Sequence, residues 1–290
     1  MNHAQLRAFH AVAEAGGFTR AAERIHVSQP TLSGQVAALE ARFGVKLFER
    51  RGRGIELTDL GRLLRDITRR LFGQEAEAEQ LLTSAQGLTT GLLRVGADAP
   101  YQVIPLLARF NRRHPGIRLS MSFGNSEQVL QELLDRRCDV AVLPDIESDA
   151  RIHALPFRRD RLVVFVPRDH AWAGRRSLRF AELAGQRLVL REPGSTTRAV
   201  LDRALAEAGV QPGMALEIGS REAVREAVAA GLGIGAVFES EFGRDPRLHR
   251  LQLRDVDLHA VEYAACLQER RPVRVVRAFF DLLHEVTPAT

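Results

Sequence analysis

Apolar residues near the N-terminus recur at the spacing of an amphipathic helix and are interrupted by turn residues. Leu6, Phe9 and Val12 predict a first helix, which a pair of glycines ends. Thr19 is placed to cap a second short helix, and Ser28 is placed to cap a third, whose first turn tolerates a proline. The pattern therefore predicts three short helices in close succession.

The third helix divides into an apolar face and a polar face. Leu32, Val36 and Leu39 share the apolar face and are expected to be buried. The polar face begins with short uncharged side chains and continues with small residues, so it can approach base edges in a major groove. There Gln29 could bond adenine and the Thr31 methyl could contact thymine. The alternative is an ordinary solvated face, which more often carries Lys and Glu.

Residues 43–58 contain two short β-prone runs on either side of the turn Arg-Arg-Gly-Arg-Gly, which predicts a β-hairpin. Arg50, Arg51 and Arg53 at its tip suit contacts with phosphates or with a narrow minor groove. A basic turn on its own is usually a solvated loop. Its place directly after the three helices favours a wing that faces DNA.

From residue 58 to about residue 88 the chain has no proline, and apolar residues alternate at spacings of three and four, interrupted once by Gln74. A helix of roughly 30 residues is about 45 Å long, too long to be buried in one small domain. We therefore expect it to pair with the same helix of a second chain, rather than to pack only on its own domain. The apolar positions are Leu60, Leu64, Ile67, Leu71, Ala78, Leu81 and Ala85.

Beyond residue 90, short apolar runs alternate with amphipathic helices such as Ile104–Arg113 and Ser126–Arg136. This alternation predicts an α/β domain with parallel strands. In such sheets, ligands lie at the carboxyl ends of the strands, where helix N-termini point inward. The predicted strands are Leu92–Gly96, Arg118–Phe123, Val140–Leu143, Leu162–Val166, Arg187–Leu190, Ala215–Ile218, Ile234–Phe238 and Tyr263–Leu267.

Four strand-to-helix junctions of this domain are rich in small polar residues, which offer backbone N–H, hydroxyl and amide groups to a small anion. Arg198 and Arg221 lie beside two of the junctions and favour an anionic ligand. The same residue types also cap helices for stability alone, so one such junction would be weak support. The candidate effector-binding residues are Ala99, Pro100, Tyr101, Asn125, Ser126, Ser195, Thr196, Thr197, Arg198, Ser220 and Arg221.

Charge is distributed unevenly along the 290 residues, whose net charge is +5. Residues 1–70 contain 12 Lys and Arg and 7 Asp and Glu, so the remaining residues contain 29 of each. All of the excess positive charge therefore lies in the N-terminal quarter. This is typical of a module that binds a polyanion and is attached to a neutral sensing or catalytic module. The length favours two or three domains.

Other classes of function find little support. The sequence shows no signal peptide and no apolar run of the roughly 20 residues that span a bilayer, so we expect a cytoplasmic protein without membrane contact. Cys138 and Cys266 lie far apart and the histidines are scattered, so we expect no metal and no cofactor. The motifs of P-loops, dinucleotide sites and nucleophile elbows are missing, which disfavours an α/β enzyme fused to a DNA-binding module. A further alternative is a second domain that only assembles oligomers.

The run from Phe18 to Gly61 resembles the DNA-binding domain of the LysR-type transcriptional regulators. An alanine pair, Ser-Gln-Pro, Leu-Phe-Glu-Arg and Leu-Thr-Asp-Leu-Gly occur in the order of that family. The resemblance implies a regulator that binds a partly palindromic double-stranded operator as a homodimer or homotetramer, and that contacts RNA polymerase if it is an activator. It places base edges or phosphates against Ser28, Gln29, Pro30, Thr31, Ser33, Gln35, Arg50, Arg51 and Arg53.

The resemblance also implies a mixed α/β architecture in three parts. These are an all-α winged helix-turn-helix over residues 1–58, a linker helix over 59–90, and an effector domain over 91–290 that is similar to periplasmic solute-binding proteins. The effector domain would comprise subdomain I (91–160 and 268–290) and subdomain II (161–267). The chain would cross near Asp160 and return near Gln268, and a helix over Pro272–Val286 would close subdomain I.

Three runs resemble, more finely, the LysR-type group associated with aminoethylphosphonate catabolism. They are Arg191–Ser195, Gly124–Leu130 and Ser220–Gly233. This resemblance implies that the effector is a small phosphonate or its breakdown product. Its anionic head would be held by Ser126, Ser195, Thr196, Thr197 and Arg198.

Overall fold

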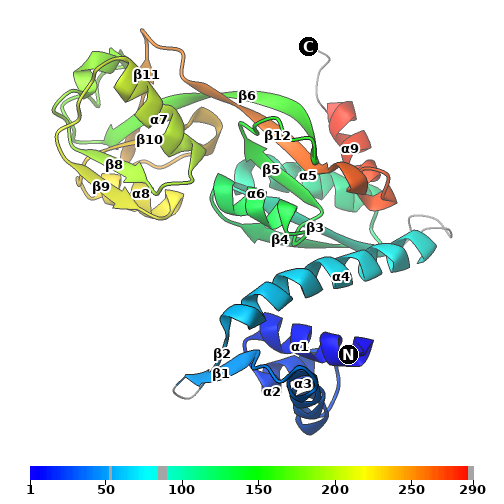
Figure 1. Cartoon of the computed structure of the whole chain (residues 1–290). Helices are drawn as coiled ribbons and strands as arrows, with labels where there is room; N and C mark the ends of the chain where they lie inside the picture. The colour runs from blue at the N-terminus through cyan, green and yellow to red at the C-terminus, as the bar shows by residue number, and fades with distance from the viewer. Residues whose placement is uncertain (52–53, 84–89, 287–290) are drawn as a thin grey trace. The chain divides into compact units, whose positions relative to one another are not determined.

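The computed structural model describes residues 1–51, 54–83 and 90–286. The chain divides into two compact units, Met1–Ala85 and Gln86–Thr290 (Figure 1). Each unit has hydrophobic cores of its own. The expected mixed α/β architecture is confirmed.

The first unit consists of three short helices, a hairpin and a long helix. Phe9, Val12 and Leu32 are buried at its centre, at most 2% exposed. The glycine end of the first helix is confirmed, because Gly16 adopts a left-handed backbone with φ of 64°. The elements are α1 (His3–Ala15), α2 (Phe18–Arg24), α3 (Gln29–Phe43), β1 (Phe48–Arg51), β2 (Gly54–Leu57) and α4 (Asp59–Thr83).

The two predicted caps have different outcomes. The Ser28 hydroxyl accepts a hydrogen bond of 3.3 Å from the Thr31 N–H, so the cap of α3 is confirmed. The expected cap at Thr19 is wrong, because α2 begins one residue before it, at Phe18. Gly17 precedes the helix with an extended backbone, and the half-buried Phe18 ring lies 5.8 Å from the ring of Phe48.

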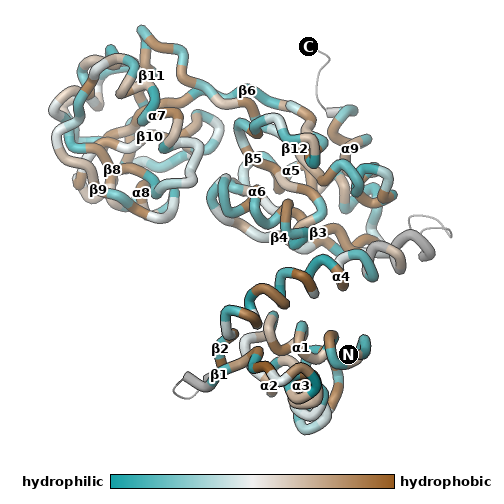
Figure 2. The backbone as a smooth tube through the Cα atoms, viewed as in Figure 1, coloured by the Kyte–Doolittle hydropathy of each residue, from teal (hydrophilic) through white to brown (hydrophobic). Residues whose placement is uncertain are grey.

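Helix α4 packs on the first unit along one side and exposes an apolar stripe along another. Leu64 and Phe72 contact the core. Leu60, Leu63, Ile67 and Leu71 are 45%, 64%, 52% and 40% exposed. Brown and teal segments accordingly alternate along α4 in Figure 2.

The start of α4 requires a glycine. A Cβ atom at Gly61 would lie 2.2 Å from the carbonyl oxygen of Leu47, which is backbone and cannot move aside.

Of the predicted apolar seam along α4, the side chain of Leu81 and the whole of Ala85 lie outside the described parts of the chain.

The second unit alternates strands and helices, as predicted. Its helices are α5 (Pro100–Arg113), α6 (Ser126–Leu134), α7 (Thr196–Glu207), α8 (Arg221–Ala229) and α9 (Arg274–Val286), with short 3₁₀ turns η2 (Phe180–Leu183), η3 (Glu239–Glu241) and η4 (Gln268–Arg270). Its strands are β3 (Gly91–Ala97), β4 (Ile117–Phe123), β5 (Val140–Pro144), β6 (Ile152–Pro167), β7 (Ser177–Leu178), β8 (Leu188–Arg191), β9 (Ala215–Ile218), β10 (Ile234–Phe238), β11 (Leu248–Leu253) and β12 (His259–Leu267).

The strands form two sheets that share the long strand β6. The first has the order β4-β3-β5-β12-β6, and β3 runs parallel to both β4 and β5. The second continues as β6-β10-β8-β9, with β8 parallel to β9 and β10, while β11 pairs with β6 and β7. The parallel βα units predicted from the sequence are therefore present in both subdomains. The antiparallel strands β6 and β12 join the two subdomains, whereas β11 lies within subdomain II.

The chain returns to subdomain I earlier than expected. Strand β12 pairs with β5 and with the first half of β6, where His259 lies opposite Arg161 and Leu267 lies opposite Ile152. The return is therefore at His259 and not near Gln268, so the expected range 161–267 for subdomain II is wrong at its end. An apolar run predicts a strand but does not show which sheet it joins. Figure 1 shows β6 and β12 running together between the sheets.

Each subdomain has a separate core. In subdomain I, Phe279 of α9 packs against Phe110 of α5, with ring centroids 6.0 Å apart. The prediction that a C-terminal helix closes this subdomain is confirmed. In subdomain II, Phe180, Phe238 and Leu251 are at most 2% exposed and form the centre of the core. These cores hold the strands rigidly, so the loops at the strand ends are well positioned.

Candidate functional site

The exposed face of α3 carries the residues that the sequence places at DNA. Leu32, Val36 and Leu39 are at most 3% exposed and fix this helix to α1 and α2. The side chains of Ser28, Gln29, Pro30 and Thr31 are exposed, and those of Ser33 and Gln35 are half-buried. The helix therefore presents uncharged polar groups at its N-terminal turn, where a groove-binding helix needs them.

One carboxylate ties the hairpin to α3. Glu40 Oε1 accepts hydrogen bonds from the backbone N–H groups of Leu47 (2.7 Å) and Phe48 (3.2 Å), and its other oxygen accepts one from Lys46. Burial by itself would raise the pKa of Glu40, but these donors outweigh it and lower the pKa. Glu40 was not among the predicted residues. A glutamate three residues before the Phe-Gly that ends α3 was the available signal.

The wing is present as the expected hairpin. Arg50 lies opposite Ile55 and Arg51 lies opposite Gly54, so both arginines are on the strand that leads into the turn. Arg53 lies outside the described residues. The hairpin prediction is confirmed, whereas the contacts of its arginines with phosphate remain a prediction.

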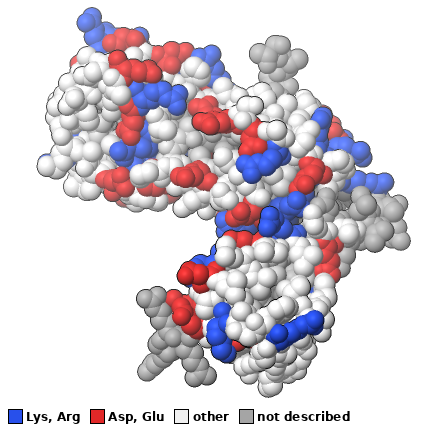
Figure 3. Space-filling model, viewed as in Figure 1, with Lys and Arg blue, Asp and Glu red and all other residues white. Residues whose placement is uncertain are grey.

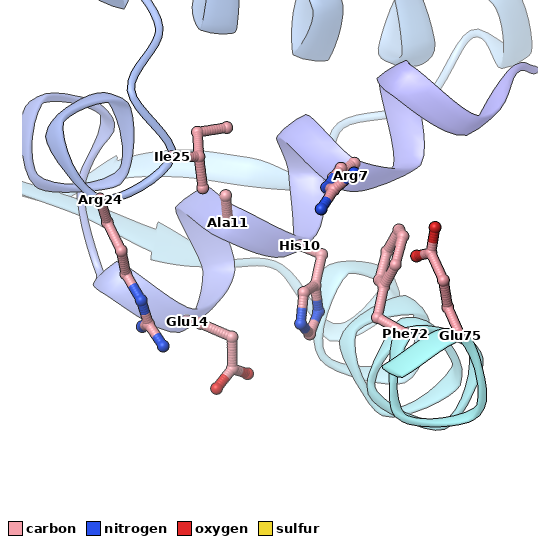
Figure 4. Close-up of a pocket in the computed structure, with 8 residues that line it drawn as sticks. All are labelled: Arg7, His10, Ala11, Glu14, Arg24, Ile25, Phe72 and Glu75. Atoms are coloured by element: carbon pink, nitrogen blue, oxygen red, sulfur yellow. The ribbon is translucent and has the colours of Figure 1, made fainter. Parts of the chain in front are cut away.

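A hollow of about 220 Å³ lies between α1, α2 and α4 (Figure 4). His10 faces it, and His10 Nδ1 lies 3.1 Å from the hydroxyl of Thr68 while its ring lies 4.9 Å from that of Phe72. Burial lowers the pKa of His10, so its neutral form is favoured. These contacts hold α4 against α1 and give no group suited to catalysis.

In the second unit, the helix N-termini meet at the boundary between the subdomains, which we call the subdomain junction. The Thr196 hydroxyl of α7 donates a hydrogen bond of 2.9 Å to the Ser126 hydroxyl of α6. The N–H of Glu127 donates to the carbonyl of Gly194 at 3.1 Å, and Asn125 Nδ2 donates to Glu192 Oε1 at 3.2 Å. Two of the four predicted junctions thus face each other directly.

The four N-termini differ in how they are capped. Asn125 caps α6 and Ser220 caps α8, each through a side-chain bond to a backbone N–H. Ala99 has no side chain able to cap α5, and Ser195 makes no capping bond to α7 although it is only 4% exposed. Asn125 and Ser220 therefore have the stabilising role considered as the alternative. The N-terminus of α7, with Ser195 and Thr197 buried beside it, keeps its dipole uncapped.

The arginines predicted for the anion are already engaged with protein groups. Arg198 binds Asp202 at 2.5 Å, lies 3.5 Å from Glu217 and donates to the carbonyl of Arg191. Its guanidinium is thus held within subdomain II. At the N-terminus of α5, Ala99 is buried, Pro100 is half-buried and Tyr101 is 38% exposed.

Arg221 is the centre of a buried charged cluster that the sequence did not reveal. Its Nη1 donates to the carbonyl of Asp98 at 2.9 Å, and its Nε lies 2.9 Å from Glu241 Oε2. Burial raises the pKa of Asp98, although Arg221 partly offsets this, and raises the pKa of Glu241 to about 7. Burial also raises the pKa of Glu262 to about 9. The only signal for Glu262 was a single acid in an apolar strand.

A second set of polar contacts crosses the junction beside this cluster. Gln102 of α5 donates to the Ser240 hydroxyl, which donates to the carboxylate of Asp160. Arg158 donates to Gln102 at 3.1 Å. The hollow beside Arg191, Thr197 and Arg221 lies within subdomain II and is too small for a water molecule. A larger hollow, of about 570 Å³, is lined by residues of both subdomains, among them Ile146, Arg203 and Tyr263.

The two cysteines are not suited to redox chemistry. Cys138 and Cys266 are buried, and burial raises the pKa of their thiols to about 12 and about 11.

In the described parts of the chain, no three His, Cys, Asp or Glu side chains are grouped so as to hold a metal ion. Among the same residues, no helix is both long enough and apolar enough to cross a membrane. On the face shown in Figure 3, acidic and basic side chains are interspersed over the second unit.

Both units match known families. Residues 3–62 match the bacterial regulatory helix-turn-helix protein, lysR family, and residues 86–288 match the LysR substrate binding domain. This chain belongs to the LysR family. The match confirms the resemblance found in the sequence and makes the protein a DNA-binding transcriptional regulator with an effector-binding domain.

Individual relatives agree with the family. The chain is 36% identical over 255 residues to the RuBisCO operon transcriptional regulator of Allochromatium vinosum, covering 87% of this chain and 84% of the relative. Full-length CbnR complexed with its target DNA is 25% identical, with a TM-score of 0.75 over 98% of this chain and 99% of that one. The CcmR regulatory domain of Synechocystis PCC6803, in complex with 2-PG, is 27% identical with a TM-score of 0.64 over 69% of this chain and 99% of that one. These relatives are regulators and not enzymes, so the enzyme alternative is set aside.

Proposed function

We propose that this LysR-type regulator binds a partly palindromic operator as a homodimer or homotetramer, and that its effector is a small anion held at the subdomain junction. The single observation that carries the ligand class is the uncapped N-terminus of α7, which faces Ser126 across the junction. A helix N-terminus without a cap favours negative charge. The finer candidate, from the sequence resemblance, is a phosphonate such as 2-aminoethylphosphonate.

The anionic head would occupy the place of the direct bond between Thr196 and Ser126. Both hydroxyls would then donate to its oxygens, and the buried Ser195 and Thr197 would complete the site. Arg198 is left out of this proposal because its partners hold it within subdomain II. The CcmR regulatory domain is known in complex with 2-PG, so 2-PG is a second ligand to test.

DNA would be read by the exposed polar start of α3 and held by the wing. The exposed stripe of α4 would pair two chains, so that two α3 helices face one operator. The effector would act by binding one arrangement of the subdomains better than another, since only such a difference can shift an equilibrium. Contact with RNA polymerase would follow if the regulator activates transcription.

Calorimetric titration of the purified protein tests the ligand class. The ligands are 2-aminoethylphosphonate, phosphonoacetaldehyde, phosphonoacetate and 2-PG, with sulfate and phosphate as controls. We expect saturable binding of a phosphonate that exceeds binding of both inorganic anions. Binding of 2-PG without any phosphonate would keep the anion site and reject the phosphonate. Binding of none of the six would reject the anionic effector.

A further inference from the structure

The subdomain junction contains more buried acid than base. The elements that meet there carry four carboxyl groups and two guanidinium groups, each at most 9% exposed in its side chain. They are Asp98, Asp160, Glu241, Glu262, Arg191 and Arg221. Buried carboxylates are costly unless a cation or a proton neutralises them. The excess of acid must therefore be neutralised by bound protons or by a further positive charge.

Glu262 is the least compensated member of this cluster. It is fully buried, and neither of its oxygens has a hydrogen-bond partner in the described parts of the chain. It lies opposite Arg158 in the pairing of β12 with β6, two positions from the pair formed by Ala260 and Asp160. Because side chains two positions apart share a face of a sheet, Glu262 and Asp160 lie on the same face, toward the junction.

Neither buried arginine forms a hydrogen bond with Glu262 in the described parts of the chain, although Arg221 lies close enough to lower its pKa. Arg221 is shared between Asp98 and Glu241, and Arg191 forms two bonds with Glu192, of 2.8 and 2.9 Å. Both oxygens of Glu241 also lack a hydrogen bond of good geometry. Both oxygens of Glu262 and Oε1 of Glu241 are thus left without a partner among the described residues, whereas Oε2 of Glu241 is paired with Arg221.

We propose that Glu262 and Glu241 form a cation subsite that takes the protonated amine of the effector, so that the ligand is a small zwitterion. This inference rests on the proposed anionic effector and adds its second charge. A metal ion is disfavoured, because no three ligand side chains in the described residues are grouped for one. An ammonium group suits the site since it carries one charge and donates three hydrogen bonds.

The two subsites are adjacent. Asp98 accepts a hydrogen bond from the Ser126 side chain and lies 3.6 Å from Arg221. It therefore links the N-terminus of α6, where the anionic head would bind, to the carboxyl cluster. We therefore expect a ligand with only a few atoms between its acid group and its amine. A short amino acid or aminophosphonate meets this expectation, and a long polyamine does not.

Binding of the amine has a consequence for protons. Without ligand, burial and the neighbouring acids Asp98, Glu241 and Asp160 raise the pKa of Glu262 to about 9, with Arg221 opposing them, so Glu262 holds a proton at pH 7. An ammonium group that binds its carboxylate must displace that proton to the buffer. Proton release is thus a readout that a merely structural glutamate would not give.

The test compares 2-aminoethylphosphonate with ethylphosphonate, which lacks the amine, by calorimetry at pH 7 in two buffers of different ionisation enthalpy. The wild-type protein should bind the amino compound at least ~10-fold more tightly, the ratio expected for a charge-assisted pair, and should release protons only with it. Glu262→Gln, which keeps the shape of the side chain, should remove both differences and leave the affinity for ethylphosphonate unchanged.

Two further variants provide an alternative test of the cation subsite and a control. Glu241→Gln should reduce the same preference for 2-aminoethylphosphonate over ethylphosphonate. It replaces Glu262→Gln as the test variant if Glu262→Gln melts at a much lower temperature than wild type. Asp169→Asn removes an exposed acid after β6 and should bind both compounds like wild type.

The outcomes separate this inference from the proposal beneath it. Equal affinity of the wild-type protein for the two compounds would overturn the cation subsite and keep the anion site. Retained preference in both variants would overturn it as well. Binding of neither compound would reject the phosphonate effector and the zwitterion together.

Discussion

Thr196 and Ser126 join the two subdomains through a hydrogen bond of 2.9 Å between their hydroxyl groups. Each residue is the first of its helix, so the bond connects the N-termini of α7 and α6. Two like helix ends repel each other through their partial positive charges. An anion between them would relieve this repulsion, which a hydroxyl-to-hydroxyl bond relieves only weakly.

Thr196→Val should weaken effector binding by about tenfold, because it removes one donor to the anion and keeps the side-chain shape. Calorimetry with the ligand that binds wild type measures the change. Arg198→Ala is the matched control within the same helix. Its guanidinium binds Asp202 and Glu217, so its loss should change affinity by less than about twofold. The reverse order of effects would refute the assignment of the anion to Thr196.

Gln29→Ala should reduce discrimination between operator and random DNA, since an exposed amide at the start of α3 is placed to read a base edge. Fluorescence anisotropy with both DNAs measures the ratio of the two affinities. We expect the difference in binding free energy between operator and random DNA to fall by about 1–3 kcal/mol. Arg51→Ala provides the contrast. It should weaken binding to both DNAs equally and reduce the slope of log affinity against log salt concentration by about one. Unchanged specificity in Gln29→Ala would sink its role in base reading.

Ile67→Asp should dissociate the dimer, because Ile67 is 52% exposed in the apolar stripe of α4 and a charge there cannot be buried in a helix pair. Sedimentation velocity gives the oligomeric state directly. Arg62→Gln, which changes an exposed polar residue of the same helix, should leave it as in wild type. A dimer that survives Ile67→Asp would show that α4 does not pair the chains.

Stability should fall as the pH rises from about 5 to 9. The pKa of Glu262 is raised from 4.5 to about 9 and that of Glu241 from 4.5 to about 7, so the folded protein binds more protons than the unfolded chain in this range. The free energy of unfolding then decreases with pH, by at most about 1.4 kcal/mol per unit for each such proton. Urea denaturation at a series of pH values should show this decline, and Glu262→Gln should flatten it above pH 7. A wild-type profile that rises from pH 6 to 9 would contradict the assignment.

The sequence predicted local structure well where spacing and caps decide it. The apolar face of Leu32, Val36 and Leu39, the cap at Ser28 and most strands of both subdomains follow from patterns a few residues long. Strands β7 and β11 and the first part of β6 were not predicted. The hairpin wing follows from its flanking β-prone runs. These features need no knowledge of what each element packs against.

Long-range contacts could not be read in the same way. The cluster of Asp98, Arg221, Glu241 and Glu262 comes from the β3–α5 connection and three elements, spread over more than half of the chain. Arg198 was expected at the anion because it follows a polar junction, but its direction depends on Asp202 and Glu217. The return at His259 depends on which sheet accepts β12, and the run itself does not specify a partner.

The two connections between the subdomains also determine how they can move. Strands β6 and β12 leave one sheet side by side, and Leu162 donates to the carbonyl of Leu258 at 2.8 Å where they separate. Two bonded strands bend together as one ribbon, so the subdomains have a single easy rotation instead of several. Different effectors would then produce different extents of the same motion. The response of the regulator should consequently vary in degree from one ligand to another and not in kind.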